Sequence, residues 1–150
     1  MFSHRKRITG TTLALLGVLI GGANAAPSSK VEVTDGWIRS MPAGIPAGGY
    51  FTLHNGTSQN LTLKGASSSA CGMLMLHKSE EMSGMASMSD VSLIDIPSGA
   101  TVKFAPGGYH LMCMDPTSAV KTGNKISVSL EFADGSKTSA EFVVRAPNGH

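Results

Sequence analysis

Short runs of β-branched and aromatic residues, each ended by turn-forming residues, dominate this 150-residue chain from residue 31 onward. No longer stretch sustains the apolar period of an amphipathic helix. Many short strands bounded by Gly, Pro, Asn or Ser are typical of β-sandwiches and Greek-key barrels. We therefore predict an all-β domain with strands at Val31–Arg39, Gly49–His54, Gln59–Lys64, Met73–Ser79, Ser87–Ile94, Thr101–Phe104, Tyr109–Met114, Lys125–Phe132 and Thr138–Arg145.

The apolar residues of the last two predicted strands lie at even positions, from Ile126 to Phe132 and from Ala140 to Val144. Both sets reach one core only if even residues pair with even residues. A two-residue Asp134-Gly135 turn would pair even with odd and would turn one apolar face outward. We therefore predict a three-residue loop over 133–135, with Gly135 in the left-handed region.

The first 25 residues have the order of a cleavable secretory signal peptide. A basic start around Arg5 leads into the apolar run Leu13–Ile20 and ends in Ala23-Asn24-Ala25. The apolar run is too short for a stable membrane span. Because no Cys follows the expected cleavage point, we do not expect a lipid anchor. The prediction is an exported, periplasmic protein with a signal peptide at 1–25 and one domain at 26–150.

The charge balance excludes several classes of protein. The whole chain has 12 Lys and Arg against 10 Asp and Glu. Removing residues 1–25 removes three basic residues and no acidic ones, which leaves 9 against 10, a net charge of −1. A nucleic-acid partner is therefore not expected. With 41% hydrophobic residues, disorder is not expected either. We also find no nucleophile–base pair or carboxylate dyad, so we do not expect an enzyme.

The two cysteines, Cys71 and Cys113, must be interpreted in an oxidising compartment. A disulfide between them is allowed there, but sequence spacing gives no geometry. Two buried thiols that pack as small apolar side chains remain the alternative.

Four residues stand out among the histidines and methionines: His77, Met88, His110 and Met112. A four-residue hairpin loop over 81–84 would place His77 directly opposite Met88, with Cβ atoms about 4.5–5.5 Å apart. His110 and Met112 are two residues apart on another predicted strand, so they share a face. The sequence therefore predicts two pairs, each of one imidazole and one thioether.

The type of ligand selects the metal. Thioether sulfur is soft and uncharged, and it favours Cu(I) over Zn²⁺, Ca²⁺ or Mg²⁺. Neutral ligands also release an ion at low cost, so they suit a carrier. We predict one Cu(I) per chain.

The spacing His77-x10-Met88-x21-His110-x-Met112 resembles the signature of the PCu(A)C periplasmic copper chaperones. Val33–Arg39, Ile96–Ala100 and Pro106–Met112 are also similar to segments of that family. The resemblance implies a cupredoxin-like β-barrel, Cu(I) binding, and delivery of copper to cytochrome c oxidase, through an oxidase subunit or its assembly factor. It leaves open whether Cu(II) uses the same site or a second one.

The other methionines and Trp37 are assigned roles outside the four-residue site. We expect Met73 and Met75 to be core residues beside the site, and Trp37 to be a core residue. Met114 is a spare ligand candidate. Met82 and Met85 are either ordinary loop residues or a loading surface for incoming copper.

Two other classes of function stay open. A blue-copper electron carrier would use His110, Cys113 and Met114 with a distant His, although the spacing argues against the required His₂Cys set. An exported structural β-domain with incidental methionines would show no copper affinity.

Overall fold

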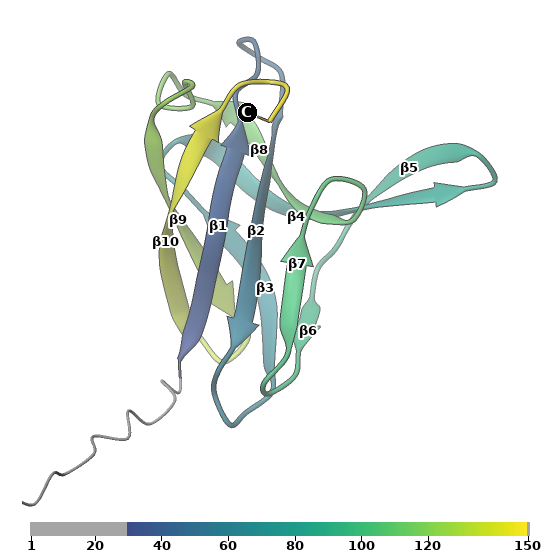
Figure 1. Ribbon diagram of the computed structural model, residues 1–150, viewed down its shortest axis with the longest axis vertical. Coiled ribbons are helices and arrows are strands. Elements are labelled where there is room, and N and C mark those ends of the chain that lie inside the picture. The colour runs from purple at the N-terminus through teal and green to yellow at the C-terminus, as the bar shows by residue number, and fades with distance from the viewer. Residues whose placement is uncertain (1–29, 150) are drawn as a thin grey trace, which may run out of the picture.

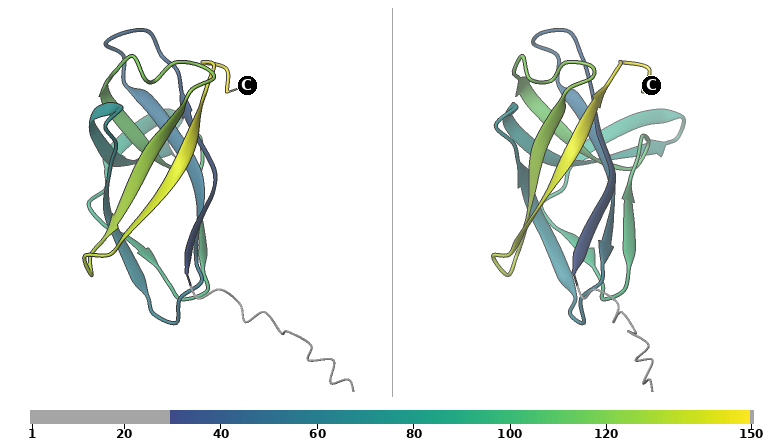
Figure 2. Two further views of the ribbon diagram at one scale, coloured as in Figure 1. Left: turned by 90° about the vertical axis from the view of Figure 1, so that its left-hand side faces the viewer. Right: turned by 60° about the vertical axis from the view of Figure 1, so that its left-hand side comes forward.

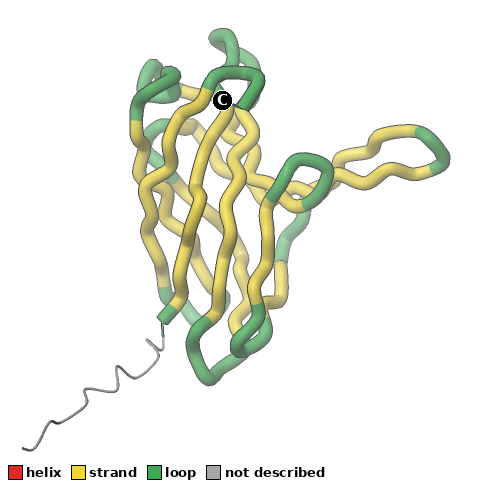
Figure 3. The backbone as a smooth tube through the Cα atoms, in the orientation of Figure 1, coloured by secondary structure: helices red, strands yellow, loops and turns green. Residues whose placement is uncertain are grey.

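The computed structural model describes residues 30–149. Within that range the regular secondary structure consists of β-strands alone (Figure 3). The predicted signal peptide, 1–25, lies outside the described residues. No segment of the described part forms a helix that could cross a membrane. The strands are β1 (Val31–Arg39), β2 (Ala47–Asn55), β3 (Leu61–Ser67), β4 (Cys71–Met82), β5 (Met85–Asp90), β6 (Ile94–Ile96), β7 (Thr101–Phe104), β8 (Tyr109–Pro116), β9 (Lys125–Phe132) and β10 (Lys137–Arg145).

Seven of these strands close into a barrel (Figure 1). Their order is β4-β8-β2-β1-β10-β9-β3, and a pairing between β3 and β4 completes the ring. Among the strands of residues 30–149, only β1 and β10 pair in parallel. β6 and β7 add to β3 and β2, while β4 continues past the barrel wall and forms a projecting arm with β5 (Figures 1 and 2). The prediction of an all-β Greek-key barrel is confirmed.

Alternate residues of the barrel strands fill its interior. Phe51, Phe104, Phe132 and Phe142 are at most 2% exposed and lie in one apolar cluster. The predicted three-residue loop is confirmed, because the Phe132 N–H donates to the Ser136 carbonyl at 2.9 Å and Gly135 has φ 86°. Even residues of β9 therefore pair with even residues of β10.

The prediction of one strand over 87–94 is wrong. The chain forms β5, which pairs with β4, and then β6, which pairs with β3 on another part of the barrel. Between them the Val91 N–H donates to the Leu76 carbonyl at 2.8 Å. Ile94 and Ile96 enter the core, whereas every residue of β5 is exposed. The chain therefore exchanges β4 for β3 as its pairing partner between β5 and β6.

Trp37 is also not a core residue. An extra residue in β1 shifts its register against β2 between Thr34 and Trp37, and Asp35 has φ 54° there. After this bulge Ile38 points inward and is 1% exposed, so Trp37 points outward. Its ring packs against that of Tyr50, with centroids 4.6 Å apart.

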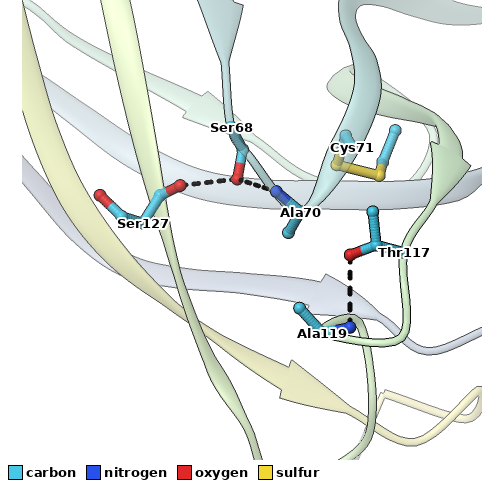
Figure 4. The surroundings of a disulfide bond; sticks show 7 residues. Ser68, Ala70, Cys71, Thr117, Ala119 and Ser127 are labelled. Atoms are coloured by element: carbon cyan, nitrogen blue, oxygen red, sulfur yellow. Dashed lines mark hydrogen bonds between the residues drawn. A yellow bond between two sulfur atoms is a disulfide. The ribbon is translucent and has the colours of Figure 1, made fainter.

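A disulfide joins Cys71 and Cys113, with Cα atoms 5.4 Å apart (Figure 4). It links the start of β4 to the middle of β8, and both sulfurs lie in the core. Around it, the Ser68 hydroxyl donates to the Ser127 carbonyl at 2.7 Å, and the Thr117 N–H donates to the Ala70 carbonyl at 2.9 Å. The question that the sequence left open is therefore answered in favour of the bridge.

Candidate copper site

The β4–β8 ladder brings two of the four predicted ligands together. His77 is the direct cross-strand partner of His110, and their ring centroids are 5.7 Å apart. Met75 is the partner of Met112 on the next pair of the same face. The two predicted ligand segments are thus neighbouring strands.

The predicted partner of His77 on the hairpin is wrong. The hairpin closes through a two-residue turn, Ser83-Gly84, and both residues have positive φ, 53° and 78°. Met82 consequently pairs with Met85, and His77 faces Asp90. Met88 faces Ser79, which is two residues beyond His77 on β4. Met88 is therefore a diagonal neighbour of His77, at the longer spacing that long side chains still span.

All four predicted ligands nevertheless share one face of the β5-β4-β8 sheet. Side chains alternate along each strand, and paired residues of an antiparallel ladder point to the same side. The alternate residues Leu74, Leu76, Leu111 and Cys113 are buried in the core. We call the opposite side, which carries Met75, His77, Met88, His110 and Met112, the ligand face.

His110 is held in a defined ring orientation. It is 3% exposed, and its Nδ1 lies 3.1 Å from the Gly108 carbonyl oxygen. Because a carbonyl only accepts, Nδ1 carries the proton and donates. This leaves the lone pair on Nε2, the arrangement usual for a metal-bound imidazole.

The ring nitrogens of His77 lack ordinary partners. Both are buried, and neither makes a hydrogen bond of good geometry within the described residues. Asp90 Oδ1 lies 2.9 Å from Nε2, and this contact does not form a hydrogen bond. Unsatisfied buried nitrogens are costly, so a metal ion would supply a partner that this ring lacks.

A pocket of about 250 Å³ opens beside His110, and His77 is not part of its lining. Met88, His110 and Met112 all contribute to its lining, together with Arg39 and Tyr50. Met88 is 56% exposed, so the outer side of the pocket is accessible to solvent. A bound ion would be held between a buried floor and an accessible sulfur.

Three aromatic and cationic neighbours of the site were not predicted. Tyr50 lies with its ring centroid 6.3 Å from that of His110, and its ring also packs against that of Trp37. The Arg39 guanidinium lies 5.9 Å from the Tyr50 ring centroid. The β1 bulge turns Trp37 outward, and no short sequence pattern indicated this bulge.

The charged side chains near the hairpin lie on opposite faces of the β4–β5 arm. Lys78 points to the side opposite His77 and pairs with Glu80. Hydrogen bonding to that carboxylate raises the pKa of Lys78 above its usual value. Asp90 is the cross-strand partner of His77, and the correct hairpin register would have revealed it from sequence.

Several of the remaining expectations are corrected or located. Met73 is 59% exposed and is therefore not a core residue. Met82 and Met85 face each other at the hairpin tip and are 65% and 74% exposed. Met114 lies on the same side of β8 as Met112 and is partly buried. Within residues 30–149, no group of three or more His, Cys, Asp or Glu residues could hold a metal ion.

The fold is that of the PCuAC domains, which confirms the resemblance. The copper-bound PCuAC domain from PmoF2 is 21% identical, with a TM-score of 0.64 over 79% of this chain and 94% of that one. Cu(I)-bound DR1885 from Deinococcus radiodurans is 28% identical, with a TM-score of 0.60 over 83% of each chain.

The sequence itself defines a narrower group. Residues 31–144 match the family described as "Putative lipoprotein LpqE-like". A protein of Leifsonia xyli subsp. xyli (strain CTCB07), named "Putative lipoprotein Lxx21020", is 33% identical over 95% of this chain and 91% of its own length. This chain belongs to the LpqE-like family.

Proposed function

We propose that this protein is an exported copper carrier that binds one Cu(I) through His77, Met88, His110 and Met112. The observation that carries the proposal is the convergence of two imidazoles and two thioethers on one face, beside a pocket lined by three of them. Cu(I)-bound DR1885, at 28% identity, supports the same metal.

The carrier role follows from the ligand chemistry and from access. All four ligands are neutral when they bind, so releasing the ion separates no charged pair. Met88 is exposed on the projecting arm, and a partner could replace this thioether first. The partner would then approach over the β4–β5 arm and the pocket.

The proposal also names the protein that receives the copper. The PCu(A)C resemblance implies transfer to a copper site of cytochrome c oxidase, either directly or through an assembly factor. Export to the periplasm agrees with the A-x-A segment at 23–25 and with a disulfide that persists in an oxidising compartment.

The disulfide removes the cysteine thiolate that a blue-copper site would require. Cys113 is bonded to Cys71 and points into the core, away from Met112 and Met114. A His₂Cys copper set on this strand would require breaking that bond and reversing the strand's parity.

The decisive test is an anaerobic Cu(I) competition titration. We expect one tight equivalent, and X-ray absorption of the loaded protein should count two nitrogen and two sulfur neighbours. His77→Ala/Met88→Ala should weaken binding by at least about a hundredfold, because half of the ligands are lost. Retention of full affinity in this variant contradicts the assignment.

A matched control removes the same two chemical groups elsewhere. His54→Ala/Met85→Ala deletes one imidazole and one thioether away from the pocket, and it should bind Cu(I) like the wild type. Affinity should also fall below about pH 6, because protons compete with the metal for imidazole. Equal loss in the two double variants would mean that the effect is nonspecific.

A further inference from the structure

Seven of the nine methionines lie between residues 73 and 114, but the proposed site uses two of them. Three others share the ligand face. Met73 pairs directly with Met114, and Met75 pairs with Met112 two residues further along, the next pair on the same face. Along β4 and β8 the rungs therefore run from Met73/Met114 through Met75/Met112 to His77/His110.

These thioethers are not explained by core packing. Met73 is 59% exposed, and Met75 and Met114 are only partly buried. The core beneath them is made by residues of the other parity, such as Leu74 and Cys113. A large apolar side chain left in solvent on a sheet face gains little hydrophobic stabilisation, so the placement calls for another account.

The rung geometry suits a small soft ion. Opposite residues on a ladder have Cβ atoms about 4.5–5.5 Å apart, and diagonal neighbours are still within reach of long side chains. Methionine is unbranched and flexible, so its sulfur can move to meet a partner. Three such sulfurs give a neutral, all-thioether set, which favours Cu(I) over harder cations.

We propose that Met73, Met75 and Met114 form a second Cu(I) site next to the His77/His110 site. The two sites meet at the Met75/Met112 rung, so an ion could move between them by exchanging one thioether for another. The proposal builds on the proposed copper function, because it makes the Met73/Met114 rung a loading or unloading position for the same ion.

The second ion should bind more weakly than the first. It has three ligands in place of four, and none is an imidazole. It also lies about two residues along the strand, roughly 7 Å, from another positive ion. At that separation charge repulsion lowers the second affinity by roughly tenfold or more.

The test is an anaerobic titration of the purified protein with Cu(I) beyond one equivalent, followed by ¹³C-methyl methionine NMR. We expect a second, weaker equivalent whose binding shifts the methyl signals of Met73, Met75 and Met114. Met73→Leu/Met114→Leu keeps side-chain volume and removes two sulfurs. This variant should lose the second equivalent and keep the first.

The hairpin tip supplies a matched control. Met82→Leu/Met85→Leu also removes two exposed, directly paired thioethers, but from the opposite side of the arm. It should retain both equivalents. The proposal is overturned if the wild type saturates at one equivalent, if Met73→Leu/Met114→Leu keeps the second, or if the control variant loses it.

These experiments can refute either copper site and leave the other one standing. If His77→Ala/Met88→Ala leaves tight binding unchanged while the Met73, Met75 and Met114 methyl signals still shift, the four-ligand site is wrong and the thioether site stands. If the tight equivalent behaves as expected and those methyl signals stay fixed in excess Cu(I), the thioether site is wrong. The NMR arm uses wild-type protein, so it does not depend on a variant's folding.

Discussion

Removing the Cys71–Cys113 disulfide should cost this domain a large part of its stability. The bridge closes a loop with a sequence separation of 42. In the chain-entropy description, a loop of that length restricts the unfolded chain by about 4 kcal/mol at 25 °C. Cys71→Ala/Cys113→Ala should therefore lower the free energy of unfolding by about 4 kcal/mol, with a small further loss from the deleted buried sulfurs.

Urea unfolding of the copper-free protein measures this change. The single tryptophan, Trp37, packs against Tyr50 and reports the transition by fluorescence. The midpoint should fall, and the m-value should rise because the unfolded chain without a crosslink exposes more surface. Wild-type protein reduced with a thiol reagent should behave like the variant. A loss below about 1 kcal/mol in both samples would refute the loop-entropy reasoning.

Three further changes test the packing and the charges. Gly36→Ala would place a Cβ 2.6 Å from the buried Phe142 ring and should cost about 1–3 kcal/mol by chemical unfolding, whereas Gly65→Ala meets nothing within 4 Å and should change stability by less than about 0.5 kcal/mol. Asn55→Ala should cost about 1–3 kcal/mol, because this fully buried amide donates to the Gln59 and Ile96 carbonyls; an unchanged thermal midpoint would contradict that. Hydrogen bonds from Ser136 lower the pKa of Asp134, so its stabilisation is present above the unfolded-state pKa and is lost as pH falls through the lower folded value. Asp134→Asn should therefore flatten the pH dependence of stability below about pH 4, and an unchanged acid profile would argue against it.

Strand parity carried most of what the sequence could predict. The even positions of β9 and β10 fixed both their pairing and the length of the loop before Ser136. The i, i+2 spacing of His110 and Met112 placed both on one face, with Leu111 and Cys113 in the core. These predictions depend only on local alternation, which a strand cannot violate without a bulge.

The errors came from features that alternation does not determine. The Ser83-Gly84 turn requires positive φ at both residues, and Ser is a less obvious choice there than Asn or Asp. The longer loop expected instead misplaced Met88 by two residue pairs, opposite His77 in place of Ser79, and hid the Asp90 neighbour of His77. The outward position of Trp37 likewise depends on an added residue in β1. Each error is a shift of register, and register depends on turns and bulges as well as on apolar pattern.

The same parity explains how the fold accommodates so many methionines on the outer side of β4 and β8. The barrel interior is filled by one set of alternate residues, including Leu74, Leu76 and Leu111, and the opposite set on β4 and β8 is left for other uses. Substituting an outer thioether such as Met73 removes no core contact, so the proposed copper ligands can change with little loss of stability. His110 is the exception, because it is 3% exposed and bonded to the Gly108 carbonyl. A variant at His110 should therefore weaken both Cu(I) binding and the fold, whereas Met88→Leu should weaken binding alone; comparing their thermal midpoints without copper separates the two roles.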